Sequence, residues 1–169
     1  MREFIRSVLF CTAIIILASN AKAENSREKM RLPEARSVQN VEVFISPHGL
    51  KTVIPLTEEM MRSHHCSFES DQPEKIADLF SRISKYLEKS DHVDEIKLRH
   101  LIYFNLKNGE KSKILMSDDA NLDYSVLANY VQGTDDGKDQ IKFRKGFLRS
   151  LREWASEGVG VKNYSQYCL

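Results

Sequence analysis

The sequence predicts a single α+β domain, with an antiparallel sheet of about five strands, two main helices packed on it and one disulfide. Three observations lead to this prediction. A long alternating apolar run precedes Asn108-Gly109, a pair typical of β-hairpins. A helical apolar period follows Pro73, and two cysteines remain in a chain that we expect to be exported.

The N-terminus is typical of a secretion signal, which we place at residues 1–23. Arg2 and Arg6 form a basic start, an apolar run covers residues 8–18, and Ala21-Lys22-Ala23 fits a cleavage site with small residues. The run of 11 residues is shorter than the roughly 20 that span a bilayer. We therefore expect cleavage, no stable membrane anchor, and a periplasmic or secreted protein.

The remaining 146 residues suit one domain. Cleavage removes three of the 25 basic residues and one of the 24 acidic residues, which leaves 22 against 23 and a net charge of −1. This balance and the expected export argue against nucleic-acid binding. Residues 24–39 are polar and without period, so we expect a flexible leader there and the domain at 40–169.

Cys66 and Cys168 are the two cysteines left after cleavage, because Cys11 lies in the signal. In an oxidising compartment they are expected to form a disulfide. Closing a loop of about 100 residues would contribute up to roughly 4.7 kcal/mol through chain entropy. A reactive or metal-binding thiol is the alternative, but neither cysteine lies in a two-cysteine motif.

The run from Ile96 to Leu106 alternates between apolar and polar residues and predicts the central strand. A three-residue loop of Lys107, Asn108 and Gly109, with Gly109 in the left-handed conformation, places Ile102 opposite Ile114 and His100 opposite Met116. A two-residue loop would set Phe104 opposite Lys113, so we prefer the longer loop. A second hairpin is expected over residues 40–56, around Pro47-His48-Gly49.

Residues 57–65 predict one helical turn capped by Thr57, with Met60 and Met61 turned inwards. His64 and His65, beside Cys66, are weak candidates for a zinc or copper site. Their spacing matches neither a metalloprotease nor a zinc finger, so we favour ordinary surface histidines and expect no cofactor.

A helix is predicted from Asp71, as its cap, to about Lys89, with Pro73 in its first turn. Its apolar stripe should lie on the sheet, and Lys75, Arg82 and Lys89 should stay outside. A short strand carrying Cys66 and Phe68 is expected just before it.

The other side of the central strand carries Lys97, Arg99, Leu101, Tyr103 and Asn105. A solvated face is the simpler interpretation. Because Tyr and Arg often anchor protein interfaces, we select Lys97, Arg99 and Tyr103 as candidate partner-binding residues. His100 falls on the core side, where it is either a buried, hydrogen-bonded histidine or a catalytic base, and we favour the structural role.

The stretch 118–139 is rich in aspartate, so calcium binding is a hypothesis for it. The positions of an EF-hand loop are missing, and a solvated acidic loop is the simpler interpretation. Within it, residues 122–131 predict a short helix or strand. Asp139 is then expected to cap a last helix, roughly 140–156, whose basic stripe consists of Lys142, Lys145, Arg149 and Arg152.

The pattern favours a non-catalytic, exported protein-binding domain that neutralises a toxin or an enzyme, as immunity proteins and inhibitors do. No nucleophile motif, phosphate-binding loop or paired metal-ligand spacing is present in the sequence. The alternative is a small metal-dependent or histidine-based hydrolase of the cell envelope that uses His64, His65 and His100. We expect a protein partner and no enzymatic activity.

Overall fold

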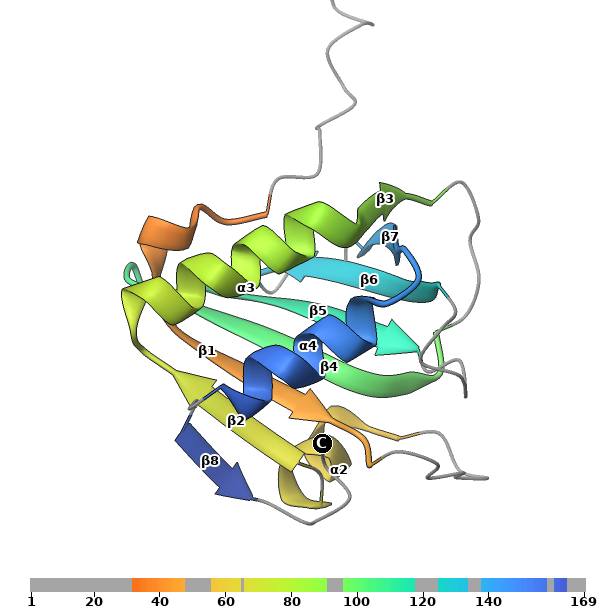
Figure 1. Ribbon diagram of the computed structural model, residues 1–169, viewed down its shortest axis with the longest axis horizontal. Coiled ribbons are helices and arrows are strands. Elements are labelled where there is room, and N and C mark those ends of the chain that lie inside the picture. Colours follow the sequence, from red (N-terminus) through yellow and green to blue (C-terminus); the bar gives the residue numbers. More distant parts are fainter. Residues whose placement is uncertain are drawn as a thin grey trace, which may run out of the picture. The chain divides into compact units, whose positions relative to one another are not determined.

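The computed structural model describes residues 32–47, 56–64, 66–90, 96–117, 125–133, 138–157 and 160–163 (Figure 1). All of its helices and strands belong to one compact unit, Pro33–Leu169. The predicted secretion signal, at residues 1–23, lies outside the described residues, as does the first half of the predicted leader.

The predicted α+β class with an antiparallel sheet is confirmed, but the predicted number of strands is wrong. The described strands form one sheet of eight, in the order β3-β7-β6-β5-β4-β1-β2-β8, and all neighbouring pairs are antiparallel. The strands are β1 (Val38–Ile45), β2 (Cys66–Ser70), β3 (Leu87–Lys89), β4 (Leu98–Leu106), β5 (Lys111–Ser117), β6 (Val126–Gln132), β7 (Lys138–Phe143) and β8 (Gly160–Asn163).

The described residues also form four helical segments. They are the 3-10 turn η1 (Ala35–Ser37) and the α-helices α2 (Glu58–His64), α3 (Pro73–Tyr86) and α4 (Phe147–Ser156). Residues 35–38 precede the predicted domain start at residue 40, and there η1 leads directly into β1 and Val38 is buried.

The β4–β5 hairpin has the predicted register. Ile102 pairs with Ile114 and His100 pairs with Met116. Gly109 has a φ of 86°, and its N–H donates to the carbonyl oxygen of Leu106 at 3.0 Å. Only glycine adopts this backbone conformation without strain, so Gly109 determines which face each β4 side chain occupies.

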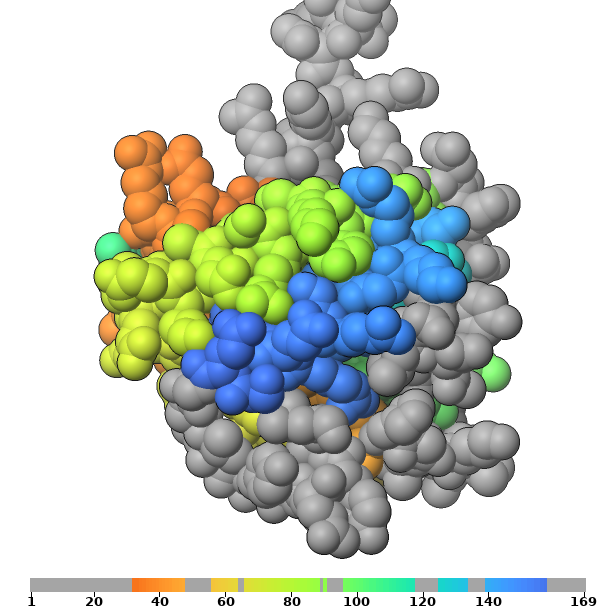
Figure 2. Space-filling model, in the orientation of Figure 1, coloured from red at the N-terminus to blue at the C-terminus, as the bar shows by residue number. Residues whose placement is uncertain are grey.

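Both α3 and α4 lie on the same face of the sheet and cover it (Figures 1 and 2). The core between these layers contains every second residue of the central strands, such as Ile102 and Phe104, which are fully buried. The rings of Phe143 and Phe147 stack there at 3.9 Å. The helices contribute Ile76, Leu79, Ile83, Phe147, Leu151 and Trp154.

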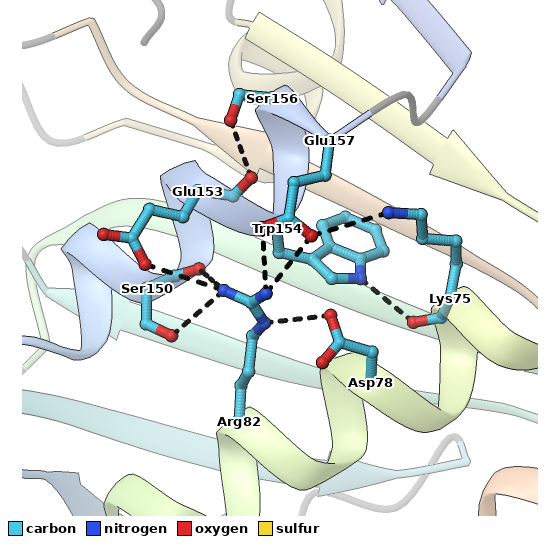
Figure 3. Close-up of polar contacts among 8 residues, drawn as sticks. All are labelled: Lys75, Asp78, Arg82, Ser150, Glu153, Trp154, Ser156 and Glu157. Carbon is cyan, nitrogen blue, oxygen red and sulfur yellow. Dashed lines mark hydrogen bonds and ion pairs between the residues drawn. The ribbon is translucent and has the colours of Figure 1, made fainter.

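The helix α3 follows the predicted apolar stripe as far as Ile83, but it ends at Tyr86 rather than near Lys89, because residues 87–89 form β3 and pair with β7. Gln72 rather than Asp71 occupies the cap position. Arg82 does not stay outside, because its side chain is 18% exposed and lies between α3 and α4 (Figure 3). Its guanidinium contacts Asp78 at 2.9 Å and Glu157 at 3.2 Å. Trp154 Nε1 donates to the carbonyl oxygen of Lys75 at 2.9 Å, which fixes the two helices further.

The predicted start of the last helix is wrong. Residues 138–143 form strand β7, and α4 begins at Phe147 after Gly146, whose φ is 89°. Arg152 is 9% exposed and donates from Nη2 to the carbonyl oxygen of Ser46 at 2.8 Å, so it is not part of a solvated basic stripe. The reason is helical spacing, since Arg152 lies four residues after the buried Leu148 and hence on the same side of α4.

Candidate partner-binding surface

The second face of the sheet, opposite α3 and α4, carries Phe44, Leu101, Tyr103 and Leu115. Leu101 and Tyr103 pair with Leu115 and Lys113 across β4 and β5, and they alternate with the core residues Ile102 and Phe104. Leu101 is 0% and Tyr103 is 6% exposed. The expectation of a solvated face is therefore wrong at these two residues.

Helix α2 covers this part of the second face. The Thr57 cap is confirmed, because the Met60 N–H donates to Thr57 Oγ1 at 3.2 Å. Met61 is fully buried, whereas Met60 is 37% exposed, so the expectation that both turn inwards is wrong. Consecutive helical residues point about 100° apart, so Met60 can stay exposed at the edge of α2 while Met61 packs against the sheet.

Beneath α2 lies a small apolar cluster, distinct from the main core. It consists of Phe44, Leu56, Met61, Leu101 and Tyr103, with Leu98 and Leu115 packed at its margin. The rings of Phe44 and Tyr103 meet edge to face at 6.0 Å, an arrangement favoured by the ring quadrupoles. Burial of this apolar area is the main force that attaches α2 to the sheet.

A group of four side chains, Glu58, Arg62, Tyr103 and Lys113, surrounds that cluster, and we call it the α2 polar network. The Tyr103 hydroxyl donates to Glu58 Oε2, and Lys113 Nζ donates to Glu58 Oε1 at 2.6 Å. The Arg62 guanidinium carbon lies 4.6 Å from the centre of the Tyr103 ring, in cation–π geometry. Both ends of α2 are thus tied to one pair of strands.

The pKa values of Tyr103 and Glu58 indicate that this network holds α2 in place and does not transfer protons. Burial, followed by the hydrogen bond to Glu58, raises the pKa of Tyr103 to about 12. Burial acts to raise the pKa of Glu58, but hydrogen bonds from Lys113 and Tyr103 outweigh it and lower that pKa below its ordinary value. Because neither group changes charge near neutral pH, neither is suited to transfer protons there.

The three predicted binding residues occupy different environments. Lys97 is exposed, Arg99 is half-buried, and Tyr103 is buried under α2. The Arg99 guanidinium donates to the carbonyl oxygen of Leu98 at 3.1 Å. A role for these residues in binding stays a prediction, and for Tyr103 it would act through α2.

Sequence reasoning missed the outward side of α2. Met60 and Arg62 are exposed on opposite flanks of the buried Met61, and Glu59 and Ser63 are exposed on the side of the helix between those flanks. A signal for the helix itself was present, because Glu58 and Arg62 are spaced by four residues behind a Thr cap. What the sequence could not show was the strand pair that receives this helix.

His100 is 1% exposed on the core side of β4. Its Nδ1 accepts the Ser46 N–H at 3.2 Å, and the same Ser46 offers its carbonyl oxygen to Arg152. This is the buried, hydrogen-bonded position that the sequence favoured. The first contact fixes the end of β1 to β4, and the second fixes it to α4.

The cysteines and the metal hypotheses are only partly within the described residues. Cys66 is 3% exposed on β2 and is disulfide-bonded. Cys168 lies outside the described residues, so its pairing with Cys66 stays a prediction. His64 ends α2 and His65 is outside the described ranges.

The acidic stretch 118–139 is described only at 125–133 and 138–139, where it forms β6 and the start of β7. Most of the aspartates in the calcium hypothesis, Asp118, Asp119, Asp123, Asp135 and Asp136, fall outside. Within the described ranges, no three side chains of metal-binding type come together as a site.

No protein-family model matches this chain, and neither the curated proteins nor the solved structures gave a match. None of the helices in the described part of the chain has the length and apolarity needed to cross a membrane.

Proposed function

We propose that this protein is a small exported, non-catalytic binding domain that neutralises a toxin or an enzyme, as immunity proteins and inhibitors do. The proposal rests on the way in which α2 is attached to the sheet. An apolar cluster and the α2 polar network hold this short helix against the sheet. The helix then presents Met60 and Arg62 to the outside.

The outward side of α2 has the composition of an interface. Met and Arg are enriched at the centres of protein interfaces, and an exposed methionine adapts to irregular apolar pockets. Met60 is the large apolar side chain that the described residues leave exposed. Because α2 is already fixed, binding through it would cost little ordering entropy.

Export is supported by the N-terminal basic and apolar segments and by the small-residue site at Ala21-Lys22-Ala23. The disulfide bond of Cys66 is also in keeping with an oxidising compartment. The neutralising role rests on analogy with exported domains of similar size.

The alternative, a metal-dependent or histidine-based hydrolase, gains no support from the described residues. His100 is buried and accepts a backbone N–H, and Glu58 and Tyr103 do not change charge near neutral pH, because the pKa of Glu58 is lowered and that of Tyr103 is raised. We therefore assign no catalytic role to these residues.

The test is affinity capture with the mature, oxidised domain from the envelope and secreted fractions of the source cell, followed by calorimetry with the purified partner. Met60→Glu places a charge on the outward side of α2. Gln132→Glu makes the same change of charge at the exposed end of β6, on the other face of the sheet.

We expect one stoichiometric protein with the native domain and with Gln132→Glu, and binding at least about tenfold weaker with Met60→Glu, since about 1.4 kcal/mol is tenfold in Kd. Equal binding by both variants would contradict docking through α2. Capture of no protein, together with tightly bound zinc by elemental analysis, would favour the hydrolase.

A further inference from the structure

Arg62 lies on one flank of α2 with its guanidinium over an aromatic ring. The side chain is exposed, and its guanidinium carbon is 4.6 Å from the centre of the Tyr103 ring. Attraction between a cation and the face of a ring favours one position of such a side chain. The guanidinium is therefore already ordered before a partner binds, which lowers the entropy cost of binding.

The carboxylate that would ordinarily pair with Arg62 is engaged elsewhere. Glu58 precedes Arg62 by four residues, and this spacing allows a glutamate and an arginine to form an ion pair on a helix. In this protein, Glu58 Oε2 accepts the Tyr103 hydroxyl, and Oε1 accepts Lys113 Nζ at 2.6 Å. Both oxygens of Glu58 are thus bound to groups of β4 and β5 rather than to Arg62.

Glu42 is a second carboxylate near Arg62. It lies on β1 opposite Tyr103, and its Oε1 accepts the Asn105 amide at 2.9 Å. The charges of Glu42 and Glu58 act on Arg62 through space. Within the described residues, however, no carboxylate forms an ion pair with the guanidinium. The fold therefore fixes the position of Arg62 without binding a carboxylate to its N–H groups.

The shape of the guanidinium matches a carboxylate. Its parallel N–H groups can donate to both oxygens at once, and such paired hydrogen bonds are among the stronger ones in proteins. Phosphate is also a common partner of arginine, but it carries up to about two negative charges near neutral pH. Glu42 and Glu58 would repel such a dianion about twice as strongly as a singly charged carboxylate. The surroundings of Arg62 thus favour a carboxylate.

We propose that Arg62, held on the Tyr103 ring, is the point at which α2 receives an acidic side chain of the protein partner. This inference rests on the proposed function and adds to it the chemistry of the partner residue, an aspartate or a glutamate. Lys113 acts as a positioning residue, because it holds a carboxylate oxygen of Glu58 that would otherwise compete for Arg62.

The test measures binding of a fluorescently labelled hexaglutamate peptide to the oxidised domain by anisotropy, at low ionic strength. Arg62→Lys keeps the charge but removes the planar set of donors. Arg36→Lys makes the same replacement at an arginine that is 83% exposed and pairs with Glu34, so it is the matched control. Labelled hexaglutamine and hexaphosphoserine peptides serve as comparison probes.

We expect Arg62→Lys to bind hexaglutamate at least about tenfold more weakly than the native domain, because the variant loses one of two hydrogen bonds between charged groups. Arg36→Lys should bind as the native domain does. Equal binding by the two variants, or no binding by the native domain, would overturn the proposal. Equal or tighter binding of hexaglutamine or of hexaphosphoserine would also overturn the preference for a carboxylate.

The role of Lys113 has its own readout. Lys113→Gln and Lys107→Gln each remove one positive charge, the second of them at the exposed β4–β5 turn. We expect Lys113→Gln to weaken peptide binding more, and this excess to disappear when Glu58→Gln removes the competing carboxylate. An excess that persists with Glu58→Gln would contradict the positioning role. Because these readouts need no captured partner, their failure is distinguishable from failure of the proposed function.

Discussion

Replacing Tyr103 by Phe removes one hydroxyl from the α2 polar network and leaves the ring in place. A hydrogen bond to a charged group contributes about 1.5–3 kcal/mol. The value here should lie at the low end, because Glu58 keeps its contact with Lys113 and its side chain is 35% exposed. We expect the free energy of unfolding to fall by about 1.5 kcal/mol, which lowers the urea midpoint by roughly 0.5–1.5 M.

The assay is urea unfolding of a double-mutant cycle with Glu58→Gln. Because Tyr103 donates to Glu58, the two changes should be coupled by about 1 kcal/mol rather than additive. Tyr130→Phe is the matched control, since Tyr130 is equally buried but lies on the other face of the sheet, and its change should add to that of Glu58→Gln within about 0.5 kcal/mol. Additive effects of Tyr103→Phe and Glu58→Gln would refute the role assigned to the network.

Four further predictions address other parts of the structure. The pKa of Tyr103 is raised to about 12 in the folded protein and is about 10 in the unfolded chain. The contribution of Tyr103 to stability should therefore be full below pH 10 and be lost as the pH rises towards 12. Ultraviolet titration that shows every tyrosine ionising near pH 10 would contradict this prediction. Gly109→Ala should lower the free energy of unfolding by about 1 kcal/mol because of its positive φ, and an unchanged urea midpoint would argue against the turn assigned here. Arg82→Met should lower the free energy of unfolding by about 1–2 kcal/mol, which lies between the values for exposed and buried ion pairs. This loss of stability should be smaller at high salt. A variant more stable than the native protein would contradict the view that the ion pairs of Arg82 fix α3 to α4. Peptide mapping without reduction should recover Cys66 linked to Cys168, and recovery of Cys168 as a free thiol would exclude that pairing.

Local signals were sufficient to predict the central hairpin. The alternation from Ile96 to Leu106 and the turn at Gly109 are both contained within a few residues, so the register of Ile102 with Ile114 followed from them. The apolar stripe of α3 was equally local.

Features that depend on distant contacts were not predictable in this way. Tyr103 was expected on an open face, and it is buried because Glu58, 45 residues earlier in the chain, brings α2 over it. The segment 140–143 fits a helical and an alternating pattern at once. Its assignment to β7 depends on pairing with β6 and β3, where Ile141 lies opposite Ala128.

The candidate site also depends on contacts between distant parts of the chain, which local sequence patterns do not reveal. Alternation correctly placed Leu101 and Tyr103 on the side of β4 opposite Ile102 and Phe104, but it failed near the start of the strand, where the pairing with β5 is irregular between Leu98 and His100 and Leu98 packs against the cluster under α2. Whether such a side meets water, a partner or another part of the chain depends on what covers it. The helix that covers it supplies the residues that we propose for binding, Met60 and Arg62.

The central claim is that the protein binds its partner through the outer side of α2, and amide hydrogen exchange of the purified complex tests it most directly. Binding through α2 should slow exchange in residues 58–64, which are otherwise a single short helix on the surface. Protection confined to other segments, with exchange in α2 unchanged, would contradict the account.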